Sequence, residues 1–168
     1  MPKISPFLWF DKEAEEAANF YVSVFPNSKL GEIQRYPEGA PGPAGTAMTV
    51  AFELNGEPFT ALNGGPLFQF NESISFVIDC ADQTEVDYFW DKLTADGGKP
   101  VQCGWLKDKY GLSWQVVPKA LYETTSGPDA AGRQRAFDAM MQMVKLDVAK
   151  LKAAYAGSDF GGGGGPTP

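Results

Sequence analysis

The sequence CGWLKDKYGLSWQVVP, residues 103–118, predicts two short β-strands joined by a tight turn. The turn is Asp108–Gly111, because Gly111 can take a positive φ where the chain reverses. The strand that follows, Leu112–Val117, is apolar and ends in two β-branched valines, and Pro118 terminates it. Two tryptophans fall in this one hairpin, so we expect it to form a wall of any pocket that the protein has.

The composition is that of a globular protein with an acidic balance. The 168 residues are 43% hydrophobic and 13% aromatic, and 14 basic against 21 acidic residues give a formal net charge of −7. The basic residues are scattered, which disfavours nucleic acid or an anionic membrane as a partner. No apolar run approaches the roughly 20 residues that span a bilayer.

The expected location is the cytoplasm. The sequence starts Met1-Pro2-Lys3 and runs directly into a predicted strand, without the apolar core of a signal peptide. Two cysteines, Cys80 and Cys103, do not make a disulfide framework, so we expect both to be reduced.

The chain contains no histidine, and this absence excludes several kinds of site. Ser-His-Asp and Cys-His nucleophile systems, most zinc sites and the two-His-one-carboxylate iron site all depend on an imidazole. We interpret Cys103 and Cys80 as inert thiols, because neither has a histidine base or a helix N-terminus to lower its pKa.

The first half predicts a strand, a helix and three further strands. A strand over Ile4–Phe10 precedes a helix that Asp11 caps, with its inner face at Ala14, Ala17, Ala18, Tyr21, Val24 and Phe25. Strands over Lys29–Tyr36, Thr46–Leu54 and Glu57–Asn63 follow. Asn55-Gly56 between the last two is the strongest short signal for a type I′ hairpin. The Pro- and Gly-rich segment 37–45 is a plain surface connection or a lid.

The second half predicts the same order of elements. A strand over Ser73–Cys80 precedes a helix that opens with a capping-box-like Asp82 and Glu85, and its inner stripe is Val86, Phe89, Trp90 and Leu93. A short strand over Lys99–Gln102 leads into the hairpin. Two helices, over Pro128–Gln142 and from Asp147 to about Tyr155, come last. The first should turn Ala136, Phe137, Met140 and Met141 inward, and we interpret Met140, Met141 and Met143 as a core or dimer-interface stripe.

The two halves are therefore two copies of one unit, offset by about 70 residues. Each reads strand, helix and three strands, and two such βαβββ modules would build a curved mixed sheet with a concave cup, where ligands bind. The predicted fold class is α+β. We expect one domain over residues 1–156, with modules at about 1–66 and 67–118, a helical extension at 119–156 and a disordered Gly-rich tail at 157–168.

Four stretches of the chain carry a resemblance to a known family. They are SPFLWFDKEAEEAANFYVSVFPNSKL (5–30), SISFVIDCADQTEVDYFWDKL (73–93), the hairpin at 103–118, and AMMQMVKLDVAKLKAAYAG (139–157). The chain resembles the PhnB-like branch of the vicinal oxygen chelate (glyoxalase/bleomycin-resistance/dioxygenase) superfamily. The resemblance implies paired βαβββ modules and a homodimer. Members of this branch often carry the name 3-demethylubiquinone 3-methyltransferase, but the sequence has no Gly-rich strand-to-helix turn for a methyl donor.

Metal-dependent members of that superfamily bind a divalent ion through His and Glu at four strand positions. The resemblance puts Ser5, Asn63, Ser73 and Gln115 at those positions. Four neutral oxygen or amide ligands bind a transition metal poorly, because nothing offsets the cost of dehydrating the dication. We therefore expect no metal and no cofactor.

Side-chain alternation along the strands completes the candidate site. Core packing is the simpler explanation of both Trp105 and Trp114. If Gln115 faces the cup, then Trp114 packs under a helix and Trp105 is the tryptophan that faces a ligand. The full predicted ligand-binding set is Ser5, Phe7, Trp9, Asn63, Ser73, Trp105 and Gln115.

Two classes of function remain open. The first is a protein that binds a small, partly aromatic molecule in a metal-free cup. The second is an enzyme, such as a lyase, isomerase, dioxygenase or methyltransferase, with Asp79, Asp108 or Tyr110 as acid or base. We favour binding, because catalysis in the superfamily mostly relies on a metal and because Asp108 is explained by the turn it stabilises. A dimeric interaction module is a third reading if large side chains fill the cup.

Overall fold

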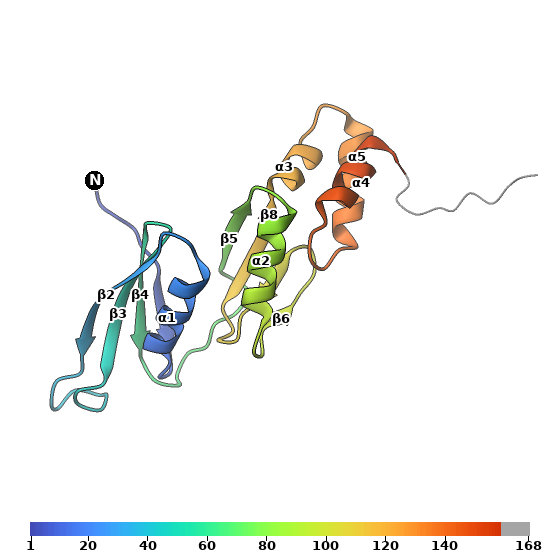
Figure 1. Cartoon of the computed structure of the whole chain (residues 1–168). Helices are drawn as coiled ribbons and strands as arrows, with labels where there is room; N and C mark the ends of the chain where they lie inside the picture. The colour runs from blue at the N-terminus through green and yellow to red at the C-terminus, as the bar shows by residue number, and fades with distance from the viewer. Residues whose placement is uncertain (159–168) are drawn as a thin grey trace, which may run out of the picture. The chain divides into compact units, whose positions relative to one another are not determined.

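The computed structural model describes residues 1–158 and divides them into two compact units, Met1–Asn71 and the described residues from Glu72 on (Figure 1). Each unit contains a four-stranded mixed sheet with a helix on one face, which confirms the α+β class and the two βαβββ-type modules. The boundary between the two units falls after Asn71. That the two sheets share one cup stays a prediction, and the predicted disordered tail falls, from residue 159 on, outside the described residues. Along residues 1–158, no helix has the length and apolar character to cross a membrane.

The sheet of the first unit has the strand order β1-β4-β3-β2. Strand β1 (Phe7–Phe10) pairs in parallel with β4 (Glu57–Asn63), and the remaining pairs, with β3 (Ala47–Leu54) and β2 (Lys29–Arg35), are antiparallel. Helix α1 (Ala14–Val24) packs on one face of this sheet. Of its predicted inner face, Ala14, Ala17, Ala18, Tyr21 and Val24 are buried and Phe25 is half-buried. The Tyr21 ring stacks on Phe52 of β3, with 6.2 Å between the ring centroids.

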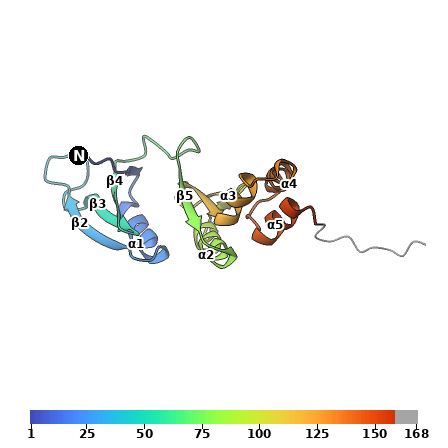
Figure 2. The same ribbon diagram turned by 90° about the horizontal axis from the view of Figure 1, so that it is seen from above.

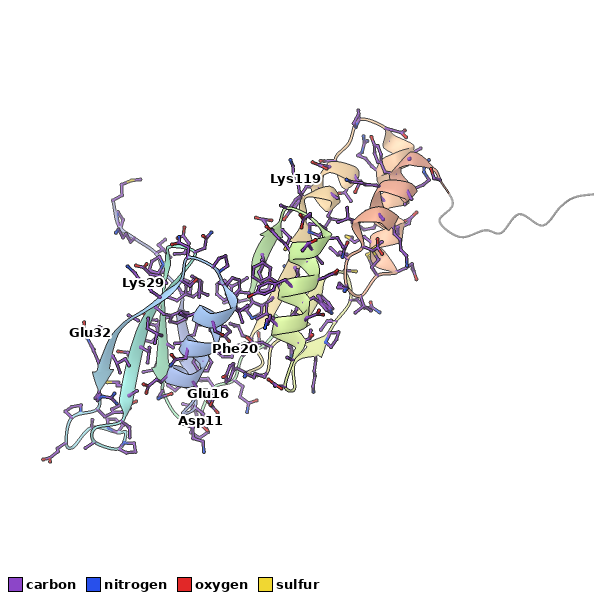
Figure 3. The ribbon with its side chains drawn as sticks, in the orientation of Figure 1. Asp11, Glu16, Phe20, Lys29, Glu32 and Lys119 are labelled. Carbon is purple, nitrogen blue, oxygen red and sulfur yellow. The ribbon has the colours of Figure 1, made fainter. Side chains whose placement is uncertain are left out.

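The predicted hairpin at Asn55-Gly56 is confirmed. Leu54 pairs with Glu57, and the two turn residues have φ values of 49° and 82°, both in the left-handed region that a type I′ turn requires. The outer strand β2 carries charged side chains such as Lys29 and Glu32 along its exposed edge (Figure 3). Charges and the irregular pairing between Leu30 and Ile33 disfavour pairing of this edge with another strand.

The predicted cap of α1 is wrong. The helix starts at Ala14, so Asp11 lies too early to cap it, and the N-cap residue Glu13 makes no side-chain capping bond. Instead, the Asn63 side chain at the end of β4 accepts a hydrogen bond from the Ala14 N–H through Oδ1 at 2.8 Å. The same carboxamide donates through Nδ2 to the Ala47 carbonyl at 3.0 Å. A residue 49 positions away in sequence therefore satisfies the first turn of this helix.

The sheet of the second unit has the strand order β5-β8-β7-β6. Its strands are β5 (Ser75–Cys80), β6 (Lys99–Pro100), β7 (Trp105–Lys107) and β8 (Ser113–Pro118), with β5 and β8 parallel. Helix α2 (Gln83–Thr94) buries the predicted stripe Val86, Phe89, Trp90 and Leu93. Its start is the predicted box: Asp82 accepts from the Glu85 N–H at 3.0 Å, and Glu85 accepts from the Ala81 N–H at 2.8 Å.

The hairpin of residues 103–118 is organised by the buried side chain of Asp108. Its Oδ1 accepts from the Tyr110 and Leu112 N–H groups at 2.9 and 3.1 Å, and its Oδ2 accepts from the Trp114 indole N–H at 2.9 Å. Gly111 has φ +85°, as the turn requires. Asp108 is 2% exposed and Trp114 is 3% exposed, so both belong to the core on the α2 side. The prediction that Asp108 stabilises the turn is confirmed.

Three helices form the C-terminal extension: α3 (Lys119–Thr125), α4 (Ala130–Met141) and α5 (Val148–Ala156) (Figures 1 and 2). Helix α3 was not predicted as a separate element. The inward assignment on α4 is confirmed for Ala136, which is fully buried, but is wrong for Phe137 and Met141, which are 47% and 46% exposed. Only small residues, Gly132 and Ala136, are buried on α4, because this helix lies close to its neighbour.

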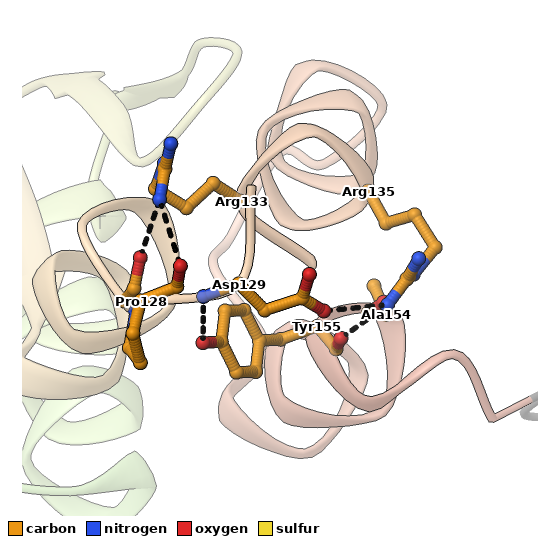
Figure 4. Close-up of polar contacts among 7 residues, drawn as sticks. Pro128, Asp129, Arg133, Arg135, Ala154 and Tyr155 are labelled. Carbon is orange, nitrogen blue, oxygen red and sulfur yellow. Dashed lines mark hydrogen bonds and ion pairs between the residues drawn. The ribbon is translucent and has the colours of Figure 1, made fainter. Parts of the chain in front are cut away.

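Polar contacts join α4 to α5 (Figure 4). Arg135 donates to the carbonyls of Ala154 and Tyr155 at the end of α5, at 2.8 and 2.7 Å. The Tyr155 hydroxyl accepts from the Asp129 N–H at 3.1 Å. Arginine at a helix C-terminus satisfies carbonyls that have no partner within the helix. The predicted cap of α5 is confirmed, since Asp147 Oδ1 accepts from the Lys150 N–H at 2.9 Å.

The extension joins the sheet at Cys103 and Gly104. Their N–H groups donate to the carbonyls of Met143 and Val144, both at 2.8 Å. Gly104 has φ +84°, and a Cβ atom there would lie 2.9 Å from the Leu146 side chain and 3.0 Å from the Val116 carbonyl. Glycine suits both conditions, because it takes a positive φ without strain and has no Cβ to meet the Leu146 side chain of the extension.

Candidate functional site

In the second unit, the candidate site lies on the sheet face opposite α2, which we call the opposite face. Alternation along β5 sends Ile78 and Cys80 toward α2, where both are buried, and sends Ser75, Val77 and Asp79 to the opposite face. On β8 the same face carries Ser113, Gln115 and Val117. The register pairs these residues into three rows across the strands.

The middle row contains the predicted aromatic residue. Gln115 is the register partner of Val77 on one side and of Trp105 on the other. Val77 is 48% exposed, and Trp105 and Gln115 are half-buried. The predicted alternation therefore holds: Trp105 shares a face with Gln115, while Trp114 packs toward α2. An indole, a carboxamide and an isopropyl group lie side by side in this row.

The uncharged polar groups of the face are Ser75, Gln115 and Ser113. Gln115 Nε2 donates to Ser75 Oγ at 2.9 Å, which leaves the amide oxygen as an acceptor. In the first row, Ser113 is 1% exposed, and its Oγ has no hydrogen-bond partner among the described residues. A buried hydroxyl without a partner carries a free-energy cost, so a water or ligand atom that reached it would be stabilising.

The two ends of the opposite face differ in charge. At the first row, Lys107 is the register partner of Ser113 and forms an ion pair with Glu72. The hydrogen bond from Lys107 to Glu72 holds the pKa of that carboxyl group below its usual value. At the third row, Asp79 Oδ1 accepts from the Tyr122 hydroxyl of α3 at 3.1 Å. Partial burial raises the pKa of Tyr122, and the bond to Asp79 raises it further.

In the first unit, Phe7 and Trp9 of β1 share the face opposite α1, as alternation predicted. Leu8 and Phe10 are buried on the helix side, whereas Phe7 is 60% exposed. Trp9 already has partners within its unit. Its indole N–H donates to the Gly65 carbonyl at 2.9 Å, and the Phe68 ring packs edge-on against it with 5.0 Å between the ring centroids. Phe7 is therefore the more accessible of the two rings.

Three predicted residues lie apart from these faces. Ser5 is exposed and precedes β1, and Ser73 is exposed and precedes β5, because both strands start later than the sequence suggested. Asn63 lies on the α1 side, where its carboxamide caps the helix and bonds to β3. The structure brings Trp105 and Gln115 together in one unit and Phe7 and Trp9 together in the other.

The residues at the four implied metal positions do not fit a divalent cation. All four are neutral, both ends of the Asn63 carboxamide are hydrogen-bonded within its unit, and Gln115 is bonded to Ser75. Across residues 1–158, no group of three or more His, Cys, Asp and Glu side chains is arranged to hold an ion. A cation there would have to displace existing bonds without gaining a charged ligand.

The candidate acids, bases and nucleophiles are mostly committed elsewhere. Asp108 lies on the α2 side and accepts three hydrogen bonds. Burial raises the pKa of the Cys80 thiol to about 12, and the nearby Glu85, Asp79 and Asp82 charges add to the shift, so it is a poor nucleophile. Cys103 lies with its sulfur 4.0 Å from the Met141 sulfur, outside the opposite face. Asp79 alone of the candidate carboxylates lies on that face.

Sequence reasoning missed three residues of the site. Ser75 takes the position predicted for Ser73. The two residues are two positions apart, so alternation puts both on the same face, and only the start of the strand tells which of them lies in the sheet. Ser113 precedes the predicted Gln115 by two residues and alternation placed it on the same face, which was a usable signal. Tyr122 had no signal, because it lies on the unpredicted helix α3.

Comparison with known proteins agrees with this fold. A family model described as 3-demethylubiquinone-9 3-methyltransferase matches residues 2–117. A solved structure from Bacillus cereus, described as a putative 3-demethylubiquinone-9 3-methyltransferase and PhnB protein, is 36% identical, with a TM-score of 0.64 over 70% of this chain and 99% of that chain. A Pseudomonas aeruginosa protein is 18% identical, with a TM-score of 0.57 over 70% of this chain and 98% of that one, which shows likeness of fold alone. No curated protein matches the chain.

Proposed function

The chain belongs to the 3-demethylubiquinone-9 3-methyltransferase family, a PhnB-like family of glyoxalase/bleomycin-resistance-fold proteins, and from this premise we propose that it binds a small, flat, partly aromatic molecule without a metal. The proposed site is the opposite face of the second unit. Trp105 supplies a ring for stacking, and Gln115, Ser75 and Ser113 supply polar groups.

The observation that carries this proposal is the middle row, in which Trp105 and Gln115 are register partners on the face opposite α2. An aromatic face beside a carboxamide suits a ring with polar substituents, because stacking removes apolar area from water while the amide orients the substituents. The unpartnered Ser113 Oγ beside this row adds a polar group that a ligand or water would satisfy.

The family description names a quinone-type substrate and methyl transfer, and only the first fits the residues described. A quinone is a flat ring with carbonyl acceptors, and on this face Gln115 Nε2 keeps a second N–H and Ser75 keeps its hydroxyl hydrogen as donors for such carbonyls. Methyl transfer needs a site for a methyl donor. The strand-to-helix connections at Asp11–Glu13 and Ala81–Asp82 contain no glycine, and side chains already cap both helices. We therefore propose binding rather than methyl transfer.

A metal-independent enzyme is the second candidate, favoured by one observation: Asp79 and the Tyr122 hydroxyl form a hydrogen-bonded pair on the proposed ligand face. Such a pair can exchange a proton with a bound molecule. Turnover of a ligand that is abolished in Asp79→Asn, with its binding retained, would favour the enzyme.

The proposed binding is tested by titrating ¹⁵N-labelled protein with duroquinone, a quinone without a free ring position for thiol addition, and with 2-(2-naphthyl)ethanol. The four tryptophan indole N–H signals are separate probes, and Trp105→Phe assigns the relevant one. We expect the Trp105 signal to move while the hydrogen-bonded Trp114 signal stays. Trp105→Ala should weaken binding about two- to tenfold, the range for one aromatic contact.

A Trp105 signal that neither compound moves, up to the limit of solubility, would contradict the proposal. The metal-free part has its own test. Elemental analysis after dialysis against Mn²⁺, Zn²⁺, Ni²⁺ and Fe²⁺ should find no ion at stoichiometric amounts, and a stoichiometric ion would revive metal-assisted chemistry.

A further inference from the structure

A carboxylate lies one row beyond the aromatic row of the opposite face. Asp79 follows Val77 by two residues on β5, so both side chains lie on the same face, about 7 Å apart along the strand. Asp79 is exposed, and its register partner Val117 is buried where α3 packs against β8. A molecule that covered Val77 and Gln115 would therefore reach Asp79 with a short side chain.

The Asp79 carboxylate is held by a residue of the extension. Tyr122 of α3 donates its hydroxyl to Oδ1 at 3.1 Å, and Tyr122 is itself 49% exposed beside it. No hydrogen bond or ion pair is made by Oδ2 within residues 1–158. Tyr122 lies beyond residues 2–117, which match the family model, so this contact is an addition to the family's core.

The charge around this end of the face is negative. Asp82 and Glu85 lie at the start of α2, immediately after β5, and together with Asp79 they act on the Cys80 thiol. Lys119 directly follows Pro118, the register partner of Cys80, and it forms an ion pair with Glu123 at 3.5 Å. A carboxylate oxygen without a partner, in a negative field, favours a cationic hydrogen-bond donor.

We propose that Asp79, oriented by Tyr122, is a cation subsite, so that the ligand of this face is an aromatic ring with a protonated amine on a short linker. The ring covers the row of Val77, Gln115 and Trp105, and the ammonium group donates to Asp79 Oδ2. This inference rests on the proposed function, because it uses the same ring site. It assigns to the helical extension a role in selecting the ligand.

The test uses two probes that differ only in the donor: 2-(2-naphthyl)ethylamine, which is protonated at neutral pH, and 2-(2-naphthyl)ethanol. Dissociation constants are measured at low salt from the Trp105 indole signal. We expect the amine to bind about fivefold more tightly, the upper range for a charge pair exposed to water. The preference should shrink at 0.5 M NaCl, because salt screens it.

Three variants locate the effect. Asp79→Asn should remove the preference for the amine and leave the affinity for the alcohol unchanged. Tyr122→Phe should reduce the preference by about half, because the carboxylate keeps its charge but loses its orientation. Glu123→Gln is the matched control, an acid on the same helix that pairs with Lys119, and should keep the preference. Circular dichroism checks that each variant is folded.

The outcomes separate the two proposals. If neither probe moves the Trp105 signal, the ring site itself is wrong and the proposed function fails. If both bind equally, or if the preference survives Asp79→Asn, the cation subsite is overturned while the ring site stands.

Discussion

The two units solve the same problem, the start of the helix after the first strand, in different ways. In the second unit, Asp82 and Glu85 cap α2 within three residues of each other. In the first unit, Asn63 reaches α1 from the end of β4. A local cap can form as soon as the helix forms, whereas the Asn63 cap requires the sheet to be assembled first. The first helix therefore depends on tertiary structure more than the second does.

The corresponding hairpins differ in the opposite sense. The β3–β4 turn of the first unit is a two-residue backbone turn, Asn55-Gly56. The β7–β8 turn of the second unit is longer and relies on the buried Asp108 side chain. In the first unit the hairpin turn is specified locally and the helix start depends on the remote Asn63. In the second unit the helix start is specified locally and the hairpin turn depends on the buried Asp108.

The largest expected effect is in the second hairpin. Asp108→Ala removes one carboxylate and leaves two backbone N–H groups and the Trp114 indole N–H without an acceptor. We expect the free energy of unfolding of this unit to fall by about 3–5 kcal/mol. Native-state hydrogen exchange of the β8 amides measures it. Asn55→Ala is the control in the first unit, and a loss there as large as that for Asp108→Ala would contradict this account.

Removing either helix cap should lower the free energy of unfolding by less than Asp108→Ala does, and by different amounts in the two units. Asn63→Ala should cost about 2 kcal/mol in the first unit, because it removes an N-terminal bond to α1 and a bond to β3 together. Asp82→Ala should cost about 1 kcal/mol in the second, the usual cost of a lost N-cap. Hydrogen exchange reports each unit separately. Equal losses would show that Asn63 acts as an ordinary cap and does not link elements.

The first strand of the first unit ends in Phe10, which does not ionise, whereas the first strand of the second unit ends in Cys80, which does. We therefore expect stability to depend on pH through this position in the second unit alone. The folded-state pKa of Cys80 is raised to about 12, so the folded state favours the neutral thiol and its stabilisation is complete below pH 9. As pH rises from 9 toward 12, the unfolded chain ionises and the second unit loses about 1.4 kcal/mol by pH 10. Urea unfolding at pH 8 and 10 checks this. The loss should be smaller in Cys80→Ala, and an unchanged loss would count against a buried neutral thiol.

The smallest effect concerns α4. Phe137 is 47% exposed, so Phe137→Ser should change the free energy of unfolding by no more than about 0.5 kcal/mol, whereas Ala136→Asp, one residue away, should cost several times more. The expected homodimer stays a prediction, and sedimentation velocity of Phe137→Ser tests whether this exposed ring serves it. A large stability loss in Phe137→Ser would mean that the ring is buried after all.

Much of the fold was predictable because most of its signals are local. The Asn55-Gly56 turn, the Asp82 box and the inner stripes of α1 and α2 depend on neighbours within a few residues. The Asp11 cap was wrong because the true acceptor, Asn63, is remote in sequence. Phe137 and Met141 were predicted to face inward because they recur at helical spacing. That spacing does not show that α4 buries its small residues, Gly132 and Ala136, and exposes the larger apolar ones.

The candidate site was predictable in part for the same reason. Alternation from Gln115 correctly placed Trp105 and Trp114 on opposite sides, since register preserves alternation along a strand. Alternation could not choose between Ser73 and Ser75, and it says nothing of Tyr122, which reaches Asp79 from a separate helix.

The close approach at Gly104 makes the effect of one substitution depend on the presence of another segment. A side chain at this position is opposed by the backbone conformation, by the Val116 carbonyl of the hairpin and by Leu146 of the extension. In a chain that ended at Pro118, the contact with Leu146 would vanish and the other two penalties would remain, so asparagine, which tolerates φ > 0, would be less unfavourable there than it is in the full chain. The effect of a substitution at residue 104 is thus epistatic with the extension.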